Sequence, residues 1–405
     1  MTSQRRHGPL AWARANLFNS PLNAVLTVVF GAFLAWAAYR AAMFVFVNAD
    51  WEIVRRNLRI LLIGRFDADQ LWRPWVALGV LSVSLGATAG MIATTSEEAA
   101  EHMGQTVTRT TPGTALRRYW PLLLLVVVLL SFTRSIAPTL ATLVVLALGA
   151  AAYLGGRRMP AAVRRFGVLV FVAGFVLAIV VLSAAGGVGW DEWGGLHVNL
   201  FVTFAGIILA FPLGLLLALG RRSRLPAVKA VSVAYIEFFR GVPLISLLIM
   251  GQLMIGFFLP PSIPAPSPVM RALIAITIFE SAYIAEIVRG GLQGVGRGQI
   301  EAAQAVGLSP FAVTRRIVLP QALRAVIPAM VGQFISLYQD TTLLSITNIQ
   351  DVLAFSDAAT AQGDFVGRGL QAVILPFVAF LFWAVSYSMS RESRRLETRL
   401  GIGVR

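Results

Sequence analysis

The chain has no cysteine, one lysine and three histidines in 405 residues. Without cysteine it forms no disulfide, no thiolate nucleophile and no cysteine-ligated metal site. The histidines, His7, His102 and His197, do not stand at metal-ligand spacing, so we expect no metal. The pattern G-x-x-x-x-G-K-[ST] is missing too, so this chain is not expected to hydrolyse ATP by itself. We therefore expect a non-catalytic protein that holds no cofactor of its own.

Charged residues are also scarce, at 13% of the chain, whereas 57% of the residues are hydrophobic. This balance excludes an ordinary soluble domain and predicts an all-α, polytopic membrane protein. A spanning helix needs about 20 apolar residues, and the sequence offers about ten such segments. They lie at 22–47, 75–94, 119–135, 138–155, 166–184, 196–219, 232–259, 269–288, 322–345 and 370–390.

The net charge of +15 does not indicate nucleic-acid binding, because the arginines cluster at the ends of apolar segments. With ten spans, the arginine-rich regions 156–165, 221–224, 296–320 and beyond 390 share one side. The positive-inside rule makes that side the cytoplasm, so we expect a multi-pass inner-membrane protein with both termini cytoplasmic. Residues 48–74 conflict with this topology, since ten spans place them outside the cytoplasm although they are rich in arginine. Either they form a short interfacial helix whose arginines meet headgroups, or the count of early spans is wrong by one.

A polar, sharply punctuated stretch lies between two apolar segments, EAAQAVGLSPFAVTRRIVLP at 301–320. Its first residues favour helix, and Gly307 is a natural helix stop because it accepts a left-handed conformation. Ser309 and Pro310 are typical of an N-cap and a first helical residue. Pro320 is expected to end the second helix or to bend it into the next span. The pattern predicts two short helices that form a docking element.

The spacing in this stretch is EAA, three residues, Gly, nine residues, then I-x-L-P, which resembles the EAA loop of ABC-importer permeases. In that family the loop is the coupling helix that sits in a cleft of the cytoplasmic ATPase. The alternative is an ordinary amphipathic loop helix. The resemblance assigns ATPase coupling to seven residues: Glu301, Ala302, Ala303, Gly307, Ile317, Leu319 and Pro320.

The resemblance extends over residues 193–405, which are similar to the five-span core of polar amino-acid ABC permeases, with the EAA loop at 296–320. It is carried by GLHVNLF (195–201), YIEFFRGVPLI (235–245), AYIAEIVRGGLQGVGRGQIEAAQAVGL (282–308), LPQALRAVIP (319–328) and QDTTLLS (339–345). Residues 1–192, with NLRILLIGRF and LWRPW, resemble the extension of general L-amino-acid uptake permeases, here of the AapM type, and should supply about five spans. Gln339, Glu280 and Asn199 depart from the family pattern, which leaves the substrate range open.

Ionisable residues inside spans are costly, so each needs a partner or a task. Glu280, near the middle of its segment, is a candidate to bind a substrate ammonium. The alternatives are a structural pair or a hydrogen bond to a neighbouring helix, or a protonated carboxyl group. Asp340, expected deep in the segment 322–345, is followed by Thr341 and Thr342, whose side chains favour local backbone bonds and loosen a helix. These three residues are candidates for the substrate pathway, with helix stabilisation as the alternative. Gln333 is a further candidate, or a helix-packing polar residue.

Glu237 and Arg240 are three residues apart and are expected to pair on one helix face, just before Gly241 and Pro243 interrupt the helix. A structural pair is the favoured interpretation, and substrate contact the alternative. Glu286 and Arg289 show the same spacing at the cytoplasmic end of their span, where a structural or gate pair is expected.

The resemblance implies a permease subunit of an ABC importer for L-amino acids. Its expected partners are an ABC ATPase dimer that carries ATP and Mg, a second permease subunit of the same or a different chain, a periplasmic substrate-binding protein, the amino-acid substrate and membrane lipid, with no nucleic acid. The alternative is an ATP-independent secondary transporter or channel, which would have no use for an EAA loop. An ABC exporter is disfavoured, because the EAA loop marks importers.

Overall fold

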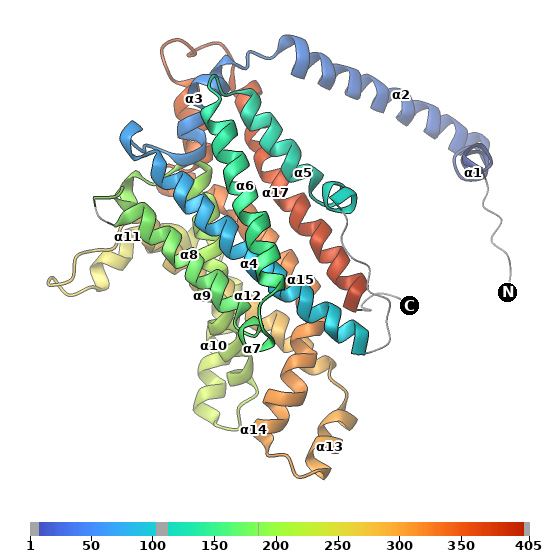
Figure 1. The fold of residues 1–405 in the computed structure, drawn as a ribbon, viewed down its shortest axis with the longest axis vertical. Helices are drawn as coiled ribbons and strands as arrows, with labels where there is room; N and C mark the ends of the chain where they lie inside the picture. Colours follow the sequence, from blue (N-terminus) through green and yellow to red (C-terminus); the bar gives the residue numbers. More distant parts are fainter. Residues whose placement is uncertain (1–7, 103–111, 185, 401–405) are drawn as a thin grey trace. The chain divides into compact units, whose positions relative to one another are not determined.

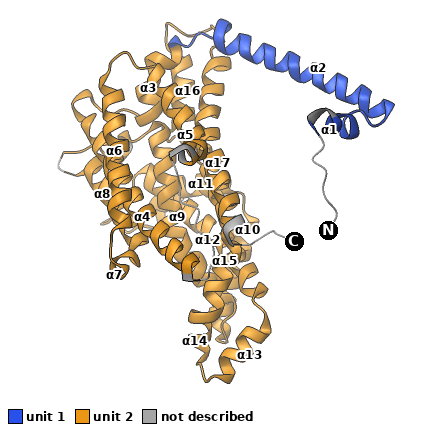
Figure 2. Cartoon of the chain, turned by 45° about the vertical axis from the view of Figure 1, so that its right-hand side comes forward, with its two compact units in different colours: residues 1–52 blue, residues 53–405 orange. Residues whose placement is uncertain are grey.

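The computed structural model describes residues 8–102, 112–184 and 186–400, which fall into two compact units, 1–52 and 53–405 (Figure 2). The first unit holds α1 (Pro9–Asn16), α2 (Pro21–Met43) and a π-helical turn, η1 (Phe44–Asn48). Ser20 begins α2 by accepting a 3.2 Å hydrogen bond from the Asn23 amide, and Pro21 takes the first helical position. None of the residues of α2 is buried.

The described residues of the second unit form helices joined by loops, and no strands. Isolated bridges join Gly64 with Trp193 and Gly195 with Asp351. Its α-helices are α3 (Glu52–Ile63, beginning at the last residue of the first unit), α4 (Trp72–His102), α5 (Pro112–Ser131), α6 (Ala137–Arg157), α7 (Ala161–Arg164), α8 (Gly167–Ser183), α9 (Gly195–Arg221), α10 (Pro226–Gly241), α11 (Leu244–Met254), α12 (Pro268–Gly294), α13 (Arg297–Ala305), α14 (Pro310–Val313), α15 (Leu319–Asp340), α16 (Val352–Thr360) and α17 (Gln371–Leu400). Shorter turns are η2 (Ala68–Gln70), η3 (Trp190–Glu192), η4 (Ile255–Phe258), η5 (Thr314–Val318) and η6 (Thr341–Thr347). The all-α prediction is confirmed.

A helix covers most of every segment that the sequence predicted to span a membrane. By length and apolar composition, six helical stretches of the described chain are long enough to cross a membrane, or seven if one bent pair counts as a span. The sequence predicted about ten. Four predicted spans lie outside the six stretches: 119–135, 166–184, 232–259 and 269–288, which hold α5, α8, α10 with α11, and α12. Of these helices, α8 has only 17 residues. The predicted span 232–259 is not straight, because α10 and α11 meet at a bend of 104°. Gly241 and Pro243 lie at this bend, as their residue types predict.

The spans of the second unit form two connected groups (Figure 1). In one group α4 packs against α6 and α8, and in the other α9, α12, α15 and α17 pack in succession. Phe175 on α8 stacks on Phe201 on α9, with ring centroids 6.1 Å apart, and joins the two groups. The predicted domain boundary at 192/193 falls inside this unit, at the end of η3, and stays a prediction.

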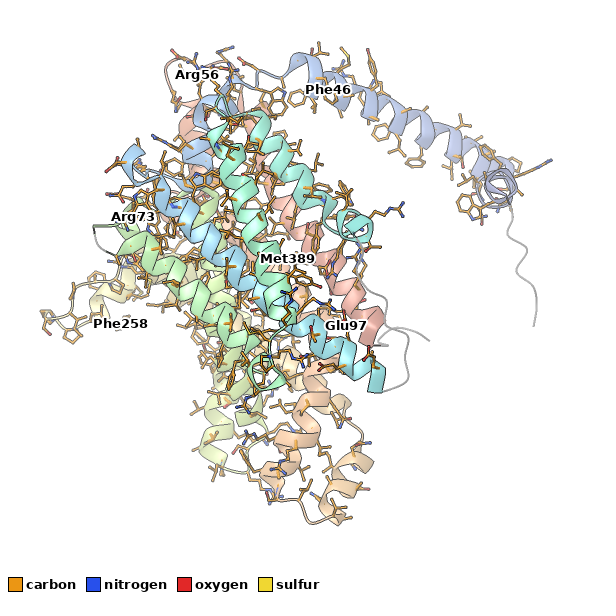
Figure 3. All side chains as sticks on the ribbon, in the orientation of Figure 1. Phe46, Arg56, Arg73, Glu97, Phe258 and Met389 are labelled. Carbon is orange, nitrogen blue, oxygen red and sulfur yellow. The ribbon has the colours of Figure 1, made fainter. Side chains whose placement is uncertain are left out.

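One of the two interpretations of the arginine-rich segment 48–74 was a short interfacial helix, and the segment contains a short helix, α3. Contact of its arginines with headgroups stays a prediction. The apolar face of α3 is buried in protein through Ile53, Val54 and Leu61, and Asn57 accepts a 2.7 Å hydrogen bond from Gln362. This face therefore packs on the loop after α16. Figure 3 shows Arg56 at the end of the second unit opposite to α13 and α14.

Candidate functional site

The stretch 301–320 folds into the helical hairpin that its residue types predict. Gly307 has φ +81° and donates a 2.9 Å hydrogen bond to the Gln304 carbonyl, while the Leu308 amide donates to the Ala303 carbonyl at 3.2 Å. These two bonds form a Schellman motif, which satisfies carbonyls that the helix end leaves free. Ser309 then caps α14 by accepting from the Ala312 amide at 3.3 Å. We call residues 297–318 the coupling hairpin.

The coupling hairpin projects from the bulk of the second unit at its lower end in Figure 1. One side of the hairpin is fixed to the rest of the second unit. Ala303 is buried in a hydrophobic core cluster, and Ile317 and Leu319 pack against that cluster. The other side is exposed and contains Glu301, Ala302 and Gly307, and Pro320 is exposed in the first turn of α15. The seven predicted coupling residues thus divide into supporting and exposed ones.

Two large apolar side chains at the tip of the hairpin were missed by the sequence analysis. Val306 is 76% exposed and Phe311 is 72% exposed. They flank the Gly307–Ser309 turn, so the turn presents an apolar tip to whatever lies beyond it. Their signal in the sequence was weak, since an apolar residue beside a helix stop is common and more often packs inward.

Glu280 and Gln333 come together in the interface between α12 and α15. The Gln333 amide nitrogen donates to both carboxylate oxygens of Glu280, at 3.2 and 3.1 Å, and Glu280 is 0% exposed. The structure therefore gives Glu280 an interhelical partner. In this arrangement the carboxylate is closed to solvent.

Asp340 is the last residue of α15 and lies within Pro310–Thr347, a helical stretch long enough to cross a membrane. Its depth in a membrane stays a prediction, whereas the loosened helix that the Asp-Thr-Thr sequence predicts is present. The Thr341 hydroxyl donates to the Tyr338 carbonyl at 2.6 Å, and the Thr342 hydroxyl donates to the Gln339 carbonyl at 2.9 Å. These side-chain bonds compete with the helical ladder, and the chain continues as the tighter turn η6. Asp340 and Thr342 are partly exposed, whereas Thr341 is buried.

A buried polar network that the sequence did not reveal joins the start of α9 to α16. The Asn199 amide donates to the Thr341 hydroxyl at 3.2 Å and to the Asp351 carboxylate at 3.1 Å, and its carbonyl oxygen accepts from the Val352 amide at 3.2 Å. Asp351 in turn caps α16 by accepting from the Ala354 amide at 2.9 Å. Thr341 is therefore bound to a structural network.

The predicted pair between Glu237 and Arg240 is wrong: no ion pair joins them in the described structure, and each residue binds a neighbouring helix. Arg221 of α9 lies 2.8 Å from the Glu237 carboxylate, and Arg240 lies 3.7 Å from Glu286 of α12. Facing helices offer these partners in three dimensions, which spacing along one helix cannot reveal. The pair between Glu286 and Arg289 is confirmed, with the Arg289 Nε donating at 2.8 Å.

Comparison with known proteins gives a consistent set of relatives. Residues 210–400 match the family described as binding-protein-dependent transport system inner membrane component. The chain is 33% identical over 428 aligned positions to the glutamate/glutamine/aspartate/asparagine transport system permease protein BztC of Rhodobacter capsulatus, covering 97% of this chain and 94% of that one. It is 41% identical over 212 residues to the inner membrane amino-acid ABC transporter permease protein YhdY of Escherichia coli, covering 52% of this chain and 57% of that relative.

Among solved structures, the chain is similar to a crystal structure of an amino acid ABC transporter with histidines. The identity is 28% and the TM-score 0.43, over 50% of this chain and 90% of that one.

Proposed function

Because this chain belongs to the family of binding-protein-dependent transport system inner membrane components, we propose that it is the permease subunit of an ABC importer for polar L-amino acids. ATP, with Mg, is bound and hydrolysed on a separate ATPase dimer. The observation that carries the coupling role is the hairpin 297–318, which is anchored by its buried Ala303 and presents exposed Val306 and Phe311. An apolar tip on an otherwise polar hairpin suits insertion into a cleft of a partner protein.

We place the coupling hairpin and both termini on the cytoplasmic side, where an ATPase is accessible. The arginine-rich ends at 156–165, 221–224 and beyond 390 support this orientation. A second permease subunit would complete the pathway, and a periplasmic binding protein would deliver substrate at the opposite end. The energy for transport then comes from the different affinities of ATP and substrate for the inward and outward states.

We assign the substrate pathway to the region around α12, the end of α15 and η6. Glu280 with Gln333, and the partly exposed Asp340 and Thr342, supply polar groups in spans that are otherwise apolar. Names of relatives support polar amino acids as the substrate class, since the BztC name includes glutamate, glutamine, aspartate and asparagine. Glu237 and Arg240 lie in the interhelical ion pairs beside α12 and act in this proposal by holding α9, α10 and α12 together.

Gly307→Leu tests the coupling role. A Cβ at position 307 meets no atom within 4 Å in this chain, so the variant should fold, apart from the local cost of φ +81°. Gly367→Leu is the control, because Gly367 is exposed, also has open space and a positive φ of +74°, and lies in the loop after α16. In proteoliposomes with the ATPase and the binding protein, we expect ATP-driven amino-acid uptake and ATPase co-purification to be lost in Gly307→Leu and kept in the control. Full uptake by Gly307→Leu, or uptake without any ATPase, would instead favour an ATP-independent transporter.

A further inference from the structure

A cluster of arginines lies where the first turns of α5 meet the last turns of α17, two helices that run side by side (Figure 1). Proline at position 121 has no N–H, so the Arg117 carbonyl loses its usual helical donor four residues on. The Arg391 guanidinium replaces that donor, with a 2.9 Å hydrogen bond to the Arg117 carbonyl. Tyr119 leaves helical geometry at this point, with φ −105° and ψ 15°. The two helices are thus locked together where their arginines gather.

The depth of this cluster in a membrane follows from the aromatic side chains beside it. Trp120 of α5 lies 5.9 Å from Trp383 and 6.0 Å from Tyr387 of α17, measured between ring centroids. Tryptophan and tyrosine gather at the boundary between headgroups and hydrocarbon. Arg391 follows Tyr387 by one helical turn, about 6 Å along α17. Its guanidinium lies 5.9 Å from the Tyr387 ring centroid, so the arginines sit at the depth of lipid phosphates.

The cluster carries an excess of positive charge. Arg118 forms a bidentate pair with Glu392, its Nε donating at 2.8 Å, and Arg395 donates to the same carboxylate at 3.0 Å. Among the side chains that the structure describes at these two helix ends, two glutamates, Glu392 and Glu397, therefore stand against five arginines: Arg117, Arg118, Arg391, Arg394 and Arg395. The side chains of Arg117 and Arg394 are exposed. Guanidinium groups donate paired hydrogen bonds to the oxygens of a phosphodiester. An excess of positive charge favours an anionic lipid over a zwitterionic one, whose own ammonium neutralises its phosphate.

We propose that this arginine cluster binds the phosphodiester of an anionic phospholipid in the cytoplasmic leaflet. The headgroup lies against Arg117 and Arg394, and the acyl chains run along the exposed rings of Trp120 and Trp383. α5 belongs to the N-terminal half of the chain and α17 to its end, so a bound lipid fastens one to the other. The site would exist whether or not the chain couples to an ATPase.

The test uses the full chain in uncharged detergent micelles, with phosphatidylglycerol or phosphatidylcholine added and the thermal unfolding midpoint measured. We expect phosphatidylglycerol alone to raise the midpoint of the wild type. Arg117→Gln with Arg394→Gln should need about 30-fold more of this lipid for the same shift. The pair Arg117→Lys and Arg394→Lys keeps the charge but not the paired donors, so it should recover part of the response. Arg158→Gln with Arg224→Gln is the control, since both arginines are exposed and lie on other loops that we place on the same side.

An equal response of the wild type and the double glutamine variant, or an equal response to the two lipids, would overturn the proposal. A variant that fails to fold is recognised by its midpoint without lipid, and the comparison of the two lipids on the wild type then carries the test. The lack of native cysteine allows a second measurement. Efficient disulfide cross-linking between two copies of Leu396→Cys would show that another copy of the chain covers this face, and would also overturn the proposal.

Discussion

The amide of Gln333 on α15 donates to both carboxylate oxygens of Glu280 on α12, at 3.2 and 3.1 Å. α12 leads into the coupling hairpin and α15 leads out of it. The bond therefore joins the two helices that flank the hairpin in sequence. A displacement of the hairpin that separates these helices would break the bond and uncover Glu280, which is fully buried here.

Gln333→Leu should lower the free energy of unfolding by about 1–3 kcal/mol, because the buried Glu280 carboxyl group loses its interhelical donor. Glu280→Leu with Gln333→Leu should recover part of this loss, since neither polar group is then left unpaired. Thermal unfolding of the single and double variants in micelles gives the coupling energy. If the two substitutions add within about 0.5 kcal/mol, the residues do not act as a pair.

The sequence predicted the features that depend on residues close to one another along the chain. Gly307, Ser309 and Pro310 form their turn through bonds that span only a few residues, and the break at Gly241–Pro243 has the same local origin. The all-α class follows from the apolar segments. These features depend on backbone conformation and composition, which residue type largely determines.

Features that depend on which helices face each other could not be predicted. Glu237 pairs with Arg221 of α9, although Arg240 lies closer along its own helix. Asn199 was noted only as unusual in the family, because its partners Thr341 and Asp351 are more than 140 positions away. Long-range contacts of this kind leave no periodic signal in one sequence.

Phe311→Ala should weaken binding of the cognate ATPase by about tenfold or more without lowering the stability of this chain. Its side chain is 72% exposed at the tip of the coupling hairpin, and a buried aromatic anchor contributes strongly to a protein interface. Phe257→Ala is the matched control, because Phe257 is 85% exposed in η4, outside the hairpin. Affinity is measured by titrating the ATPase onto the chain in nanodiscs. Equal affinities of the two variants would remove Phe311 from the interface.

Asp351 should make stability depend on pH. Its burial outside the spanning helices raises the pKa of the carboxyl group from 3.8 to about 6, while hydrogen bonds from Ala354 and Asn199 oppose the shift. The folded state therefore holds this proton more tightly than the unfolded state. The resulting stability is fully present below pH 3.8 and is lost as the pH rises through about 6, by about 3 kcal/mol in total.

Unfolding midpoints of the wild type and Asp351→Asn between pH 4.5 and 8 check this dependence. The midpoint of the wild type should fall relative to that of the variant as the pH rises, because the asparagine does not titrate. A difference between the two that stays constant over this range would mean that Asp351 has an ordinary pKa.

Gly156→Ala should destabilise the packing of α6 on α4, and Gly155→Ala should not. A Cβ at position 156 would lie 2.2 Å from the Ala87 carbonyl oxygen of α4, a backbone atom that moves only if the whole helix moves. Such overpacking costs about 1–3 kcal/mol. A Cβ at position 155 meets nothing within 4 Å, so that variant should gain about 0.5–1 kcal/mol from helix propensity. Both substitutions add the same methyl group to neighbouring residues of one helix, so the difference between their unfolding midpoints isolates the contact. Equal midpoints would mean that α4 and α6 are not in close contact at Gly156.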